Sequence, residues 1–134
     1  MELKKIIFSL SVVFLLSCTE RRPEFLYEYV LNNQSGVDMN MILYRTKNDT
    51  INIANGKEYR FEFSMEHGYG DISSLSCDSL GLIFNNNKKK IYKYSDKSNR
   101  NPLLSKSFVI TEVNEYHYLF RYTFTEEDYM SIKK

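Results

Sequence analysis

The stretch EYHYLFRYTF, residues 115–124, has the most regular pattern in this chain. Aromatic residues occupy every second position from Tyr116 to Phe124. Successive side chains of a β-strand point to opposite faces, so this spacing places the aromatic rings on one face. Because burial of such a stripe is a strong source of stability, we expect the strand to line a core. The alternative interpretation is an exposed platform on which sugars stack.

Seven other segments share the aromatic and β-branched composition that suits strands, and their spacing is typical of a β-sandwich or barrel. They are 26–32, 38–46, 49–54, 57–64, 79–85, 90–95 and 107–113. Residues 25–134 are therefore predicted to form one all-β domain, a single antiparallel β-sandwich of the immunoglobulin-like type. The acidic segment after Thr125 predicts a short C-terminal helix, with Thr125 as N-cap and Asp128 three residues later, close to a capping box.

The dipeptide Asn55-Gly56 is a hairpin signal between two of these segments. A three-residue loop over 54–56 would place Ile51 opposite Tyr59, whereas a two-residue loop would place Ile51 opposite the charged Arg60. We therefore expect the longer loop, with Gly56 in the left-handed conformation. Lys88-Lys89-Lys90 follows a run of three asparagines and is interpreted as part of a solvated turn.

The first eighteen residues, MELKKIIFSLSVVFLLSC, have the pattern of an export signal. Two lysines precede an apolar run over 6–16, which is shorter than the roughly 20 residues that a membrane-spanning helix needs. The segment LLSC (15–18) resembles a lipobox, the site at which a lipoprotein signal is cleaved before a lipid-modified cysteine. Cys18 is therefore the predicted lipidation site, and ordinary secretion with an incidental Cys18 is the alternative.

This interpretation divides the chain into a signal peptide (1–17), a lipidated tether (18–24) and the β domain. The polar tether would reach only about 20 Å, so the domain would lie close to the membrane. The chain has 18 basic and 17 acidic side chains. The signal carries two basic residues and one acidic residue, so the mature chain is neutral. Neutrality argues against nucleic-acid binding as the main role.

The sequence shows no motif for a known catalytic or metal chemistry, and neither a cofactor nor a metal site is predicted. Cys77 is the one cysteine left beside Cys18. We expect it to be buried, the alternative being a free thiol that pairs between chains. His67 and His117 are the only histidines that could activate it in a small hydrolase, which is the least favoured function.

Two further kinds of site are candidates. Tyr69, Tyr92 and Tyr94 are candidate ligand contacts if the domain binds glycans. Asp49-Thr50-Ile51 and Asp78-Ser79-Leu80 resemble a loose acceptor motif for O-glycosylation in exported Bacteroidota proteins, so Thr50 and Ser79 are candidate modification sites.

Several stretches together resemble small lipoproteins of Bacteroidota. They are the Cys18 signal, YEYVLNNQSG (27–36), DSLGLIFNNNKKKIY (78–92) and RYTFTEEDY (121–129). The resemblance implies a lipid anchor followed by a compact β domain, and it implies no particular activity. We expect an exported protein held in the outer membrane by the lipid on Cys18. The domain lies on either the periplasmic or the surface side of that membrane, and the sequence does not decide between them. The favoured function is a non-catalytic binding or accessory module whose partner is another envelope protein or a glycan.

Overall fold

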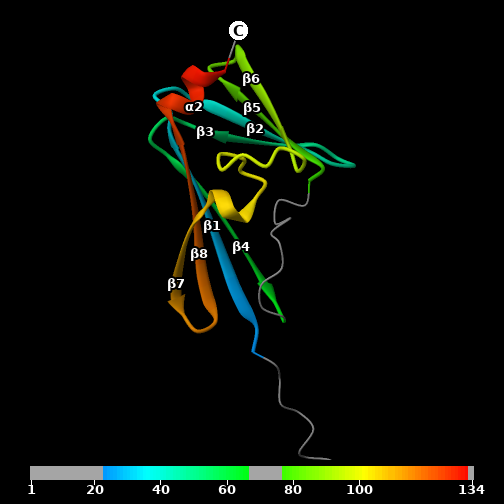
Figure 1. The fold of residues 1–134 in the computed structure, drawn as a ribbon, viewed down its shortest axis with the longest axis vertical. Helices are drawn as coiled ribbons and strands as arrows, with labels where there is room; N and C mark the ends of the chain where they lie inside the picture. Colours follow the sequence, from blue (N-terminus) through cyan, green and yellow to red (C-terminus); the bar gives the residue numbers. More distant parts are fainter. Residues whose placement is uncertain (1–22, 67–76, 133–134) are drawn as a thin grey trace, which may run out of the picture.

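The computed structural model describes residues 23–66 and 77–132, which form two four-stranded sheets and one short helix (Figure 1). The all-β sandwich is thus confirmed. Its elements, in chain order, are β1 (Phe25–Gln34), β2 (Met39–Tyr44), β3 (Asp49–Ile53), β4 (Glu58–Met65), β5 (Ser79–Phe84), β6 (Lys88–Lys93), the 3₁₀ turn η1 (Ser105–Ser107), β7 (Val109–Asn114), β8 (His117–Thr125) and α2 (Glu126–Ser131).

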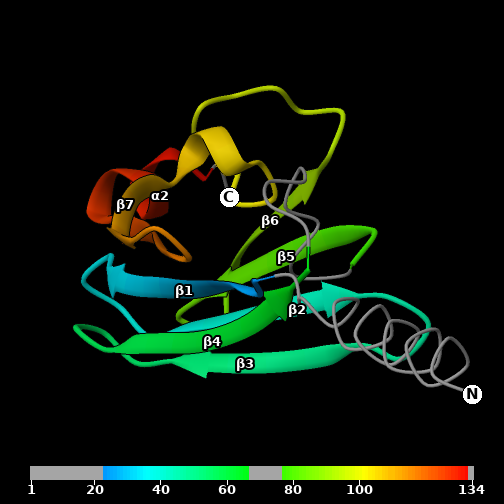
Figure 2. The same ribbon diagram turned by 90° about the horizontal axis from the view of Figure 1, so that it is seen from below.

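Sheet A has the strand order β4-β1-β8-β7, and sheet B has the order β3-β2-β5-β6. Sheet A extends further than sheet B toward the end where β1 begins (Figure 1), which is the end from which Figure 2 is viewed. Sheet B is antiparallel throughout, whereas β1 pairs with β8 in parallel and makes sheet A mixed. Immunoglobulin constant domains have the strand orders A-B-E-D and C-F-G. The likeness to them is therefore one of layered architecture and not of strand order.

The aromatic stripe of β8 lines the core, as its alternation predicted. Phe120, Tyr122 and Phe124 are each at most 1 % exposed, whereas Tyr116 lies in the turn before the strand and is exposed. The registers of β1 with its two neighbours place Tyr29 between Phe61 and Phe120. The Tyr29 ring stacks on both, with centroid separations of 5.0 and 4.9 Å. Offset stacking of this kind adds to the stability that burial gives.

The expected hairpin between residues 49–54 and 57–64 is wrong, because β3 and β4 belong to different sheets. Ile51 pairs with Met41 in sheet B, and Tyr59 pairs with Leu31 in sheet A. Gly56 does adopt the left-handed conformation, with φ of 73°. It does so in a turn closed by the N–H of Lys57 on the carbonyl of Ala54, and this turn carries the chain from one sheet to the other.

The C-terminal helix is confirmed with its cap. The Thr125 hydroxyl accepts a hydrogen bond from the backbone N–H of Asp128, whose carboxylate accepts one from the N–H of Thr125. The three lysines of 88–90 are not in a turn but begin strand β6. Each ammonium group lies over an aromatic ring, 4.4 Å from the ring centre of Tyr129 in the case of Lys88.

Candidate functional site

Three of the sequence-predicted site residues lie outside the described residues. They are Cys18, His67 and Tyr69.

Tyr92 does not offer a surface to a ligand, which corrects the expectation drawn from the sequence. Its side chain is 1 % exposed, and its phenol has a pKa raised to about 12, chiefly by burial. Tyr94 is half-buried and packs against the main core. The sequence pattern could not separate these two tyrosines from surface ones, because their burial is set by strands and a helix far away in the chain.

The two candidate O-glycosylation positions lie in sheet B. Thr50 is exposed in β3, an edge strand, whereas Ser79 is half-buried where β5 begins. Thr50 is therefore the more accessible hydroxyl of the two.

Among the described residues, Cys77 and His117 have separate surroundings. Cys77 is 6 % exposed, as expected, and desolvation raises the pKa of its thiol, which disfavours the nucleophilic thiolate. His117 lies in β8, where its Nε2 is 3.4 Å from Oε2 of Glu28 in the neighbouring strand. In the described part of the chain, no group of three or more His, Cys, Asp or Glu side chains could hold a metal ion.

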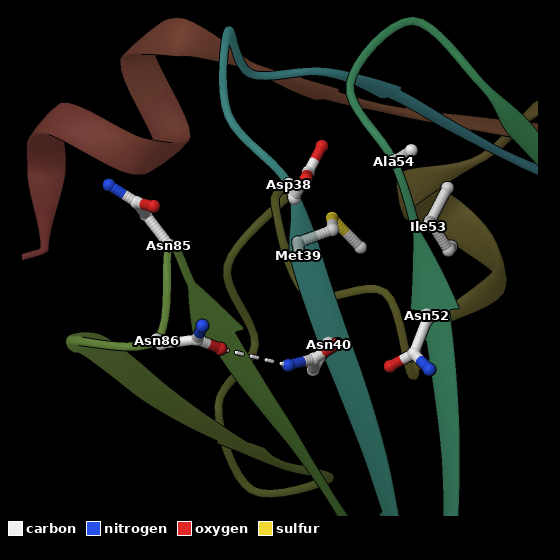
Figure 3. A pocket seen from close by; sticks show the side chains of 8 residues that line it. All are labelled: Asp38, Met39, Asn40, Asn52, Ile53, Ala54, Asn85 and Asn86. Carbon is white, nitrogen blue, oxygen red and sulfur yellow. Dashed lines mark hydrogen bonds between the residues drawn. The ribbon is translucent and has the colours of Figure 1, made fainter.

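A polar groove of about 350 Å³ opens at the end of sheet B that lies beside α2 (Figure 3). It is formed by the start of β2, the end of β3 and the turn between β5 and β6. Its lining residues are Asp38, Met39, Asn40, Asn52, Ile53, Ala54, Asn85 and Asn86. This volume is at the lower end of the range for small-ligand pockets.

Three asparagines meet in the groove although they are distant in sequence. Asn40 and Asn52 are directly opposite each other in the β2–β3 register, so their side chains share the outer face of the sheet. Nδ2 of Asn40 donates to Oδ1 of Asn86 at 3.3 Å, and Figure 3 shows these two side chains directed toward one another. The groove thus carries several primary amides within reach of one small molecule.

Asp38 joins the turns that surround the groove. Its Oδ1 accepts a hydrogen bond of 2.9 Å from the backbone N–H of Asn55, in the turn between β3 and β4. Its carbonyl oxygen accepts another of 2.9 Å from the N–H of Asn85, in the turn between β5 and β6. Because the walls are tied together in this way, a ligand would meet a largely preformed surface.

The buried side chain of Asn33 supports the groove from below. Its Nδ2 donates at 2.8 Å to the carbonyls of both Val37 and Ile53, the residues that precede Asp38 and Ala54. Its Oδ1 accepts from the N–H and the hydroxyl of Ser35. All the capacity of this amide is used to hold the backbone next to the groove.

The turn that carries Asn85 and Asn86 needs residues that tolerate the left-handed conformation. Both residues have positive φ, 47° and 58°, in a turn closed by the N–H of Asn87 on the carbonyl of Phe84. Asparagine tolerates the left-handed region better than other residues with side chains. The sequence marks this run as a turn, but nothing in it indicates that the side chain of Asn86 is directed toward Asn40.

The chemistry of the groove is that of uncharged amides. Each asparagine side chain has two donor hydrogens and an acceptor oxygen, and none of these groups titrates near neutral pH. Asp38 is the only charged residue among the described residues that line the groove. Such a surface can bind and orient a polar molecule, but it offers no strong nucleophile.

The chain matches no family model, no curated protein and no solved structure. Among the described residues, no helix is long and apolar enough to cross a membrane.

Proposed function

We propose that this protein is a lipid-anchored, non-catalytic binding or accessory module of the bacterial cell envelope, held in the outer membrane through Cys18. The signal pattern of residues 1–18 supports the anchor. More than one acyl chain on the cysteine would give durable attachment.

The position of the groove relative to the anchor carries the proposal. The tether reaches the domain at Phe25, where β1 begins, and β1 ends at Gln34 beside the residues that support the groove. Ten residues of strand span roughly 30 Å. The tether is shorter, at about 20 Å. A domain held at the start of β1 would therefore present its groove away from the membrane, where envelope components are accessible.

The lining of the groove supports binding without catalysis. General acid–base catalysis needs a titratable side chain positioned near the reacting atoms. In the part of the lining that the structure describes, Asp38 is the one carboxylate, and one of its oxygens already accepts the N–H of Asn55. The proposal would fail if the full chain turned over a substrate at a rate that groove substitutions abolish.

Lipid attachment is tested by metabolic labelling of the full chain with a radioactive fatty acid in a bacterial host. Wild type and Cys77→Ala are expected to be labelled and to sediment with membranes. Cys18→Ser is expected to lose the label, and an inhibitor of lipoprotein signal peptidase should make the uncleaved precursor accumulate. Equal labelling of the Cys18→Ser variant would contradict the anchor.

The binding role is tested by purifying the lipidated protein through a C-terminal tag in mild detergent. A stoichiometric envelope component that Asn52→Ala releases would support the module. A component that this substitution leaves bound would place the interaction elsewhere on the domain.

A further inference from the structure

We infer that the polar groove takes an uncharged carbohydrate, which deepens and rests on the proposed binding function. The carbohydrate would be bound by Asn40, Asn52 and Asn86, not by the tyrosines that the sequence suggested.

The charge of the groove argues against ionic ligands. Among the described residues, no lysine or arginine lines it, so these residues offer a phosphate, sulfate or carboxylate ligand no cationic partner. The carboxylate of Asp38 would repel an anion directly. Of the described lining residues, only this carboxylate could pair with a cation, and one of its oxygens already accepts the Asn55 N–H. An uncharged polar ligand is the class that remains.

The hydrogen-bonding capacity of the amides matches vicinal hydroxyl groups. Within the described residues, Asn40 uses one donor hydrogen on Asn86, which leaves the oxygen of Asn40 and the amino group of Asn86 for a ligand. The amide of Asn52 stands beside that of Asn40 in the register. A sugar hydroxyl both donates and accepts, so neighbouring hydroxyls can bond to an amide oxygen and an amide N–H together.

The size and rigidity of the groove fit the same ligand. A volume of about 350 Å³ admits a short oligosaccharide end rather than a folded domain. The hydrogen bonds of Asp38 and Asn33 fix the walls before a ligand arrives. Binding a sugar costs free energy because the sugar loses much of its hydration. A preformed site avoids the further cost of ordering protein side chains on binding.

The test uses the full lipidated chain in a detergent without a sugar headgroup, with ¹⁵N-labelled side-chain amides observed by NMR. The probes are the neutral tetrasaccharides of glucose, mannose and N-acetylglucosamine, each compared with the anionic tetragalacturonate. We expect at least one neutral probe to shift the amide signals of Asn40, Asn52 and Asn86 in a saturable way, and tetragalacturonate to leave them unchanged.

Two substitutions locate the site. Asn52→Ala removes one exposed amide, and Asn86→Gly removes another while keeping the left-handed turn, because glycine adopts positive φ freely. Each should weaken binding about five-fold, the effect of one lost hydrogen bond. The control Asn99→Ala changes an exposed asparagine that does not line the groove and should bind like wild type.

Three results would overturn the inference: no response to any neutral probe, a response to tetragalacturonate alone, or binding that both groove variants retain. In each case the fatty-acid labelling of Cys18 and the co-purification experiment still decide the proposed function independently. A loss of labelling with sugar binding intact would instead remove the anchor and leave the carbohydrate site in place.

Discussion

The side chain of Asn33 in sheet A donates a hydrogen bond of 2.8 Å to the carbonyl of Ile53 in sheet B. The two residues are far apart in the chain, and this bond joins the sheets at the end where the groove opens. Asn33 is fully buried, so its amide would be costly to leave without partners.

Replacement of Asn33 by alanine should therefore destabilise the domain strongly. The carbonyls of Val37 and Ile53 would each lose a donor, and Ser35 would lose its acceptor. We expect the free energy of unfolding to fall by about 3 kcal/mol, since each buried unsatisfied group costs roughly 1–3 kcal/mol. Urea unfolding of the full chain measures this, with the exposed Gln34→Ala as control. Equal midpoints for the two variants would show that the amide has no such role.

The second prediction concerns Asp128, whose carboxylate caps α2 and pairs with the guanidinium of Arg100. The Arg100 side chain also donates to the carbonyl of Thr123 at 2.8 Å and lies over the Tyr122 ring. Asp128→Ala should lower stability by about 2 kcal/mol, because the cap and the ion pair are lost together. The neighbouring Glu127→Ala, an exposed first-turn position, should change it by less than about 0.5 kcal/mol. Thermal unfolding distinguishes the two outcomes.

The eight strands and the capped helix could be predicted from sequence because their signals are local. Alternation in β8 and the Thr125–Asp128 pair act over a few residues. The pairing of those strands could not be predicted in the same way. The parallel pairing of β1 with β8 joins the first and last strands in the sequence, so no local pattern indicates it. The signal at Asn55-Gly56 specifies a turn but not which sheets the turn connects.

The groove could not be predicted from the sequence, for the same physical reason. Its asparagines come from two strand ends and one turn, and each taken alone is an ordinary surface or turn residue. They form a site only because the β2–β3 register and the turn after β5 bring them together. The aromatic residues gave a stronger signal, but that signal reports burial in the core.

The third prediction follows from the raised pKa of Tyr92. Its phenol has a pKa of about 12 in the folded domain against an ordinary value near 10, and the main cause is burial. Folding favours the neutral phenol. The stability that depends on a neutral Tyr92 is therefore fully present below pH 10 and is lost as the pH rises toward 12. The Tyr92→Phe variant should lose less stability than wild type over that interval, by up to about 2 kcal/mol. Urea midpoints measured at pH 9 and pH 11.5 provide the comparison, and parallel losses in both proteins would disprove it.

The fourth prediction is that Cys77 reacts slowly with thiol reagents in the folded protein. Burial raises the pKa of its thiol, against a smaller opposing effect of Arg45. Both the low thiolate fraction and the restricted access slow the reaction. Labelling with an aromatic disulfide at pH 8 should be at least about ten-fold faster in urea than in buffer. Rapid labelling without denaturant, or a disulfide-linked dimer on a non-reducing gel, would contradict a buried thiol.

The fifth prediction concerns the packing of Tyr44 on Gly81, two residues of adjacent strands in sheet B. A Cβ atom at position 81 would lie 2.9 Å from Cε2 of the tyrosine, closer than normal contact allows. Gly81→Ala should therefore displace the ring and cost about 1–2 kcal/mol. In a Tyr44→Ala background the obstacle is gone, and the same change should be neutral or stabilising, because glycine in a strand is unfavourable by roughly 0.5–1 kcal/mol. A double-mutant cycle of unfolding free energies measures the coupling, and additive effects of the two substitutions would exclude the contact as the reason for glycine at this position.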